Sequence, residues 1–87
     1  MLKGTTSTGF EFEISDATLN DWRLLEHIAD MEEGDDFAVV RLARVLLSDN
    51  DQYKRLMEHC TVEGRVERNK VTDEIIEIMK SGNEVKN

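Results

Sequence analysis

The sequence contains no proline, one cysteine and few aromatic residues, which make up 6% of its 87 residues. The single cysteine, Cys60, cannot form a disulfide within the chain, so a disulfide framework is excluded. No N-terminal apolar run follows Lys3, so nothing indicates export or a membrane span, and we expect a cytoplasmic protein. Without Pro-rich or Gly/Ser-rich linkers there is no domain boundary to propose. We expect one globular domain at 1–80 and a flexible C-terminal tail at 81–87.

Basic residues are also scarce, which limits the partners that the protein can attract. The chain has 11 Lys and Arg against 19 Asp and Glu, and its formal net charge is -8. This charge disfavours binding to nucleic acid and to anionic membranes, and it favours a basic or neutral protein partner. The sequence has no glycine-rich phosphate loop, no nucleophile elbow and no basic patch interleaved with aromatic residues. We therefore expect neither enzymatic activity nor a cofactor.

Alternating apolar and acidic residues predict a strand over 10–14, in which Phe10, Phe12 and Ile14 share one face. A lone strand leaves its backbone groups unpaired, so it needs a neighbour. The segment Leu2–Thr6, which is followed by a turn-prone Ser-Thr-Gly, is the expected neighbour in a hairpin. The alternative is an open edge that pairs with a second chain.

The first predicted helix follows the strand directly, with Ser15 or Asp16 as its N-cap. It ends near Glu32-Glu33-Gly34, and its apolar side is expected to bring Trp22 near the strand. The members of that side are Leu19, Trp22, Leu25, Ile28 and Ala29.

A third predicted helix starts at an Asp49 or Asn50 cap, and a final helix covers about 70–80 and ends at Gly82. The segment 61–69 is predicted to be a loop with a short extended piece. The apolar stripes of these two helices are Tyr53, Leu56, Met57 and Cys60, and Val71, Ile75, Ile78 and Met79. The predicted fold class is α+β and mainly helical, with a short N-terminal strand or hairpin followed by about four helices.

The second predicted helix, from Asp35-Asp36 to about Leu47, is apolar around nearly its whole circumference. Helices in a small bundle normally keep a wide polar face, so two arrangements are open. Either this helix is central and covered by the others, or Phe37 joins Arg41 and Arg44 in an exposed patch that docks a partner or another copy.

The histidines and the cysteine define a rival reading, a small enzyme or metal protein that uses His27, His59 and Cys60. Neighbouring residues on a helix diverge by roughly 100°, so His59 and Cys60 cannot chelate one ion together without other ligands. The acidic pairs Glu32-Glu33 and Asp35-Asp36 flank Gly34, where helix capping explains them better than calcium binding. We therefore expect no metal site.

Four stretches, in this order and over roughly residues 9–80, resemble the small tail assembly chaperones of long-tailed phages and prophages of Gram-positive bacteria. They are GFEFEI, LNDWRLLEHIADME, LLSDNDQYKRLMEHC and EGRV. The sequence departs from that pattern at Ser48, where a glycine often closes the second helix, and at Glu67, where a proline is common. Both positions lie at element ends and concern local turn geometry.

The resemblance implies a non-enzymatic protein that binds the long helical tape measure protein, keeps it soluble and helps recruit tail tube subunits. It also implies a location in the bacterial host cytoplasm and absence from the mature virion. A homo-oligomer is left open. The alternative function is an acidic regulatory module, antitoxin-like or inhibitory, that neutralises a basic partner. The residues expected to form the protein interface are Phe10, Phe12, Ile14, Phe37, Arg41 and Arg44.

Overall fold

The computed structural model describes residues 1–85, and it begins with an antiparallel β-hairpin. Strand β1 (Leu2–Thr5) pairs with β2 (Glu11–Ile14) from the Leu2↔Ile14 pair to the Thr5↔Glu11 pair. Between the strands, the Gly9 N–H donates to the Thr6 carbonyl at 2.9 Å, and Gly9 has a φ of 94°. A positive φ is readily adopted only by glycine, so Gly9 fits this turn. The predicted hairpin is confirmed.

The region predicted as the first helix forms two helices, α1 (Asp16–Leu19) and α2 (Trp22–Glu32). Ser15, one of the two predicted candidates, caps α1, but Asp21 caps a new helix by accepting the Arg23 N–H at 2.9 Å. Hydrogen bonds from Arg23 lower the pKa of Asp21 to about 2, so the cap stays ionised at neutral pH. Trp22, which was predicted to lie on the apolar side of this helix and near the strand, points outward and is 70% exposed.

The remaining helices follow the predicted order. Helix α3 (Ala38–Leu46) is followed by α4 (Asn50–His59), which Asp49 caps as expected. A second hairpin of β3 (Thr61–Val62) and β4 (Arg65–Val66) then leads into α5 (Arg68–Val85). Helix α5 continues through Gly82 instead of ending there, so it includes most of the predicted tail 81–87. Residues 86 and 87 of that tail lie outside the described part of the chain.

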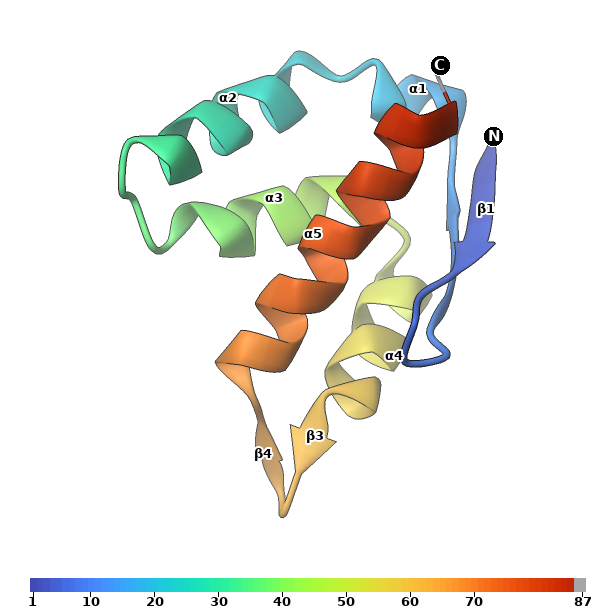
Figure 1. Ribbon diagram of the computed structural model, residues 1–87, viewed down its shortest axis with the longest axis vertical. Coiled ribbons are helices and arrows are strands. Elements are labelled where there is room, and N and C mark those ends of the chain that lie inside the picture. Colours follow the sequence, from blue (N-terminus) through green and yellow to red (C-terminus); the bar gives the residue numbers. More distant parts are fainter. Residues whose placement is uncertain (86–87) are drawn as a thin grey trace.

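The elements surround one core to which nearly every one of them contributes. Helices α2 and α3 run side by side in opposite directions, α5 crosses α3, and the N-terminal hairpin lies beside α4 (Figure 1). The predicted stripes of α4 and α5 face this core. Its buried members are Leu2, Phe10, Phe12, Ile14, Leu24, Leu42, Ala43, Leu46, Leu47, Leu56, Cys60, Ile75 and Ile78. The α+β, mainly helical class is confirmed.

Membrane crossing requires a helix of about 20 predominantly apolar residues. Within residues 1–85, no helix has both the length and the apolar character for this.

Candidate interaction surface

The outward face of α3 carries an unusual set of exposed side chains, which we call the α3 stripe. Its residues follow the i, i+3, i+4, i+7 spacing that places side chains on one side of a helix. Phe37 is 73% exposed and Val40 41% exposed, whereas Ala38 and Leu42 on the opposite side are buried. The α3 stripe consists of Phe37, Val40, Arg41 and Arg44. Of the two arrangements considered for this helix, the structure has the exposed one.

Local contacts at the start of α3 hold this stripe in place. The Asp35 carboxylate accepts the Phe37 N–H at 3.0 Å and the Arg41 guanidinium at 2.6 Å. The hydrogen bond from Arg41, and then that from the Phe37 N–H, lowers the pKa of Asp35. Arg41 also lies 3.6 Å from Asp30 of α2. Arg44 forms no ion pair with any residue of the described chain, so its charge is available to a partner.

The other half of the expected interface lies inside the molecule. The side chains of Phe10, Phe12 and Ile14 are 3%, 4% and 1% exposed, respectively. The alternation along the strand is real, but the face that these residues share covers the helices. They therefore form core contacts, and in this conformation they cannot touch a partner.

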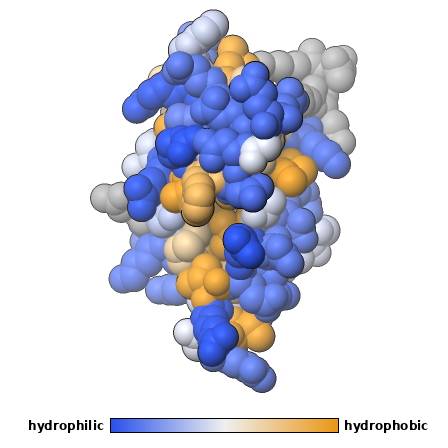
Figure 2. All heavy atoms as spheres, turned by 90° about the vertical axis from the view of Figure 1, so that its left-hand side faces the viewer, coloured by the Kyte–Doolittle hydropathy of each residue, from blue (hydrophilic) through white to orange (hydrophobic). Residues whose placement is uncertain are grey.

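A further exposed apolar surface lies between α2, α3 and α5, and the sequence patterns did not predict it. It is a groove with a volume of about 480 Å³, and we call it the apolar groove. Leu25 of α2 is 59% exposed and Ile76 of α5 is 38% exposed. Figure 2 looks at the end of the molecule where α2 and α3 connect, and apolar side chains there form an interrupted band between hydrophilic ones. The groove lining is Leu2, Leu19, Leu24, Leu25, Ile28, Met31, Glu32, Leu42, Leu46, Ile76, Ile78, Met79 and Lys80.

A signal for this groove exists in the sequence of α2. Leu24 and Leu25 are adjacent, and neighbouring residues on a helix diverge by roughly 100°. A helix that buries Leu24 must therefore turn Leu25 toward another surface, and Leu25 is indeed well exposed. An apolar face wider than one stripe indicates a surface in excess of what the core needs.

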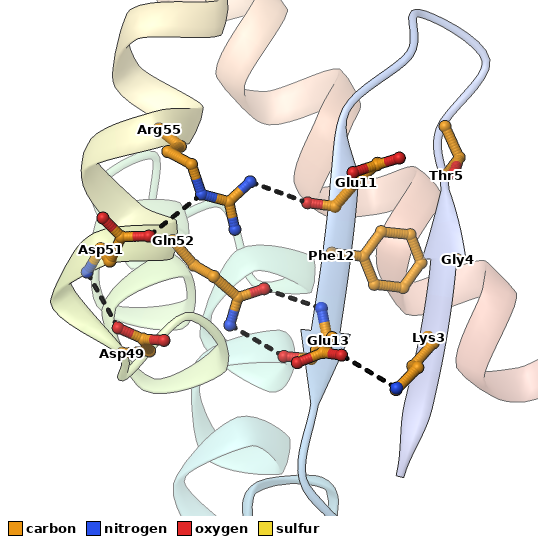
Figure 3. Close-up of a pocket in the computed structure, with 10 residues that line it drawn as sticks. All are labelled: Lys3, Gly4, Thr5, Glu11, Phe12, Glu13, Asp49, Asp51, Gln52 and Arg55. Atoms are coloured by element: carbon orange, nitrogen blue, oxygen red, sulfur yellow. Dashed lines mark hydrogen bonds and ion pairs between the residues drawn. The ribbon is translucent and has the colours of Figure 1, made fainter.

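Strand β2 uses both of its edges within the chain. One edge pairs with β1, and side chains of α4 cover the other (Figure 3). The Glu13 N–H donates to the Gln52 amide oxygen at 2.7 Å, and the Gln52 amide nitrogen donates to the Glu13 carbonyl at 2.8 Å. Arg55 donates to the Glu11 carbonyl at 3.3 Å. Because these contacts take up the backbone groups that a further strand would need, β2 offers no edge to a second chain.

Gly4 provides the room that the Phe12 ring occupies on the neighbouring strand (Figure 3). A Cβ atom at Gly4 would lie 2.8 Å from the Phe12 Cζ atom. We expect Gly4→Val to lower the free energy of unfolding by about 1–3 kcal/mol, because overpacking forces side chains from their preferred rotamers. Urea denaturation monitored by circular dichroism measures this, with Thr5→Val on the adjacent, outward-facing position as the control. Equal stability of the two variants would show that the ring moves aside freely.

The turn of the first hairpin is held on α5 by hydroxyl and carboxylate groups. Glu74, which is 3% exposed, accepts the hydroxyl of Thr6 at 2.8 Å and that of Thr8 at 2.9 Å. Glu77 accepts the Ser7 hydroxyl at 2.7 Å and also the Ser7 N–H. A buried carboxylate needs such donors to offset its lost hydration. These contacts fix the turn of the hairpin against α5, and Leu2 of the same hairpin contributes to the apolar groove.

The two histidines and the cysteine proposed for an enzyme or metal site lie on separate helices or already contact other residues. His27 belongs to α2 and His59 to α4. His59 Nε2 lies 2.9 Å from the Thr8 hydroxyl, and its ring centroid is 5.6 Å from that of Phe10. Cys60 is 1% exposed, and burial, together with the nearby Glu74, raises the pKa of its thiol. Among the residues that the structure describes, no group of three or more His, Cys, Asp or Glu could hold a metal ion.

Comparisons of this chain with protein-family models, with curated proteins and with solved structures found no match.

Proposed function

We propose that this protein is a phage tail assembly chaperone that binds the tape measure protein through the apolar groove and assists assembly of the tail tube. The observation that carries the proposal is the groove itself, which is lined almost entirely by apolar side chains. Exposed apolar surface of this kind is typical of binding sites for proteins, membranes or apolar ligands, and the resemblance to tail assembly chaperones favours a protein.

The apolar lining of the groove suits an amphipathic helical client. Its walls are the helices α2, α3 and α5, which leave between them a trough lined by Leu25, Ile28 and Ile76 among others. An amphipathic helix can lay its apolar face into such a trough, with anchors at i, i+3, i+4 and i+7. A long helical tape measure protein presents many such segments, and covering them keeps it soluble until tube subunits assemble around it.

The proposed place of action is the cytoplasm of the bacterial host. A chaperone that shields the client during assembly must leave when tube subunits cover the same segments. We therefore expect the protein to be absent from the mature virion.

Co-expression with the tape measure protein encoded in the same gene neighbourhood tests this function. We expect the client to become soluble and to co-purify, and the complex to survive a rise from about 0.1 to about 0.5 M NaCl, because apolar contacts are not screened by salt. A client that stays insoluble and does not co-purify would contradict the proposal. A complex that dissociates steeply with salt would support the acidic regulatory module instead.

A further inference from the structure

The outward face of α2 carries a second exposed stripe, which differs in charge from that on α3. Its residues follow the i, i+4, i+7, i+11 spacing of one helix face, continuing just past the end of the helix. Trp22 is 70% exposed, and the other members are exposed too. We call this the α2 stripe, and it consists of Trp22, Glu26, Ala29 and Glu33.

The two stripes are complementary in chemistry. Each has one large exposed aromatic residue, Trp22 on α2 and Phe37 on α3. The α2 stripe adds two glutamates, and the α3 stripe adds two arginines, of which Arg41 is already paired with Asp35. Within the described chain, neither glutamate of the α2 stripe forms an ion pair, and neither does Arg44. Aromatic residues and arginine are enriched at protein interfaces, and complementary charges across an interface favour the matching partner.

We propose that a second copy of this chain docks here, with the α2 stripe of one copy against the α3 stripe of the other. Both complementary halves are on the same chain, so another copy supplies the matching surface without any further partner. This contact uses faces other than the apolar groove, so it does not depend on the proposed function and leaves the groove open to a client.

The two stripes lie on neighbouring helices of each copy. Helices α2 and α3 lie side by side in opposite directions (Figure 1). Each copy carries both stripes, so a contact between the α2 stripe of one copy and the α3 stripe of another joins two copies and leaves one stripe of each copy free. The first product of this association is a dimer. Repulsion between two copies of net charge -8 opposes it, so we expect a dimer that forms at high protein concentration.

Charge reversal combined with mixing tests the dimer. The first variant is Arg44→Glu, which replaces the unpaired arginine of the α3 stripe with a glutamate, and the second is Glu26→Arg with Glu33→Arg, which makes both stripes basic. We expect each variant alone to raise the dimer dissociation constant about tenfold, measured by analytical ultracentrifugation, because like charges then face each other. An equimolar mixture of the two should associate again, since every stripe regains an opposite partner.

Arg65→Glu is the control for Arg44→Glu, because it makes the same change in net charge in the β3–β4 hairpin, outside both stripes. It should leave the dissociation constant within about twofold of the original protein. Circular dichroism checks that each variant is folded, as expected for substitutions at exposed positions. The proposal is overturned if the original protein stays monomeric at the highest attainable concentration. It is also overturned if the stripe variants dimerise normally, or if the mixture fails to associate.

Discussion

Replacing Phe12 with alanine is expected to lower the free energy of unfolding by about 3–5 kcal/mol, the usual effect of truncating a buried phenylalanine. The same replacement at Phe37 should change it by less than about 0.5 kcal/mol, as at other surface positions. The two residues are chemically identical, but Phe12 is 4% exposed and Phe37 is 73% exposed. Phe12 also covers Gly4 on the neighbouring strand, so its removal leaves a cavity beside bare backbone.

Urea denaturation of the two variants, monitored by circular dichroism, measures this difference. A small domain has a total stability of about 5–15 kcal/mol, so the change at Phe12 removes a large part of it. Phe37→Glu serves as a second check, because a charge at a buried position would unfold the protein. If Phe37→Glu unfolds the chain, or if Phe12→Ala has no effect, the assignment of the two residues to surface and core is wrong.

Placing lysines at Leu25 and Ile76 is expected to weaken binding of the tape measure protein at least about tenfold, equivalent to about 1.4 kcal/mol or more. These residues contribute to the groove from α2 and α5, respectively. A client helix that enters the groove would have to bury both ammonium groups without a partner, and burying an unpaired charge is strongly unfavourable. The free protein should keep its stability, because both side chains are already substantially exposed.

The control for the groove variant is Val62→Lys in the second hairpin. Val62 is 40% exposed, close to the 38% of Ile76, but it does not line the groove. Isothermal titration calorimetry with a soluble fragment of the tape measure protein measures the dissociation constants of the original protein, the groove variant and the Val62→Lys control. Equal loss of affinity at Val62 would place the binding surface elsewhere or indicate a general effect of added charge.

Local patterns were sufficient to predict much of the fold. The period-two alternation around Phe12 predicted a strand, and the turn before it predicted the hairpin partner. Ser15 and Asp49 were correctly expected as caps, because their side chains accept backbone N–H groups that a helix start leaves unpaired. The stripe of α4 predicted the burial of Leu56 and Cys60. These features depend on residues close together in the sequence.

Features set by competition between neighbouring segments were harder to predict. Asp21 is as good a cap as Ser15, so a second helix can start at Trp22 as readily as the first can continue through it. Gly82 suggested a helix end, but glycine is tolerated inside a helix for about 1 kcal/mol, and α5 continues past it.

The candidate site also combines features that a local pattern could predict with features that it could not. The sequence left two arrangements open for Phe37, buried in a central helix or exposed in a patch, because an apolar helix gives no information on which of its faces stays uncovered. The strand residues Phe10, Phe12 and Ile14 were assigned to the interface for a related reason, since a one-sided apolar strand looks the same against its own helices or against a partner. The apolar groove requires α2 and α3 to meet α5, which is distant from them in the sequence, so the adjacent Leu24 and Leu25 could indicate surplus apolar surface but not the groove itself.

Site-specific photo-cross-linking tests the central claim most directly, namely that the apolar groove binds another polypeptide. A photo-reactive amino acid is introduced at Leu25 in the groove or at Val62 in the second hairpin, and each variant is co-expressed with the tape measure protein. The account predicts a cross-link to the tape measure protein from position 25 and none from position 62. Cross-linking from position 62 alone, or none from position 25 in a co-purifying complex, would contradict it.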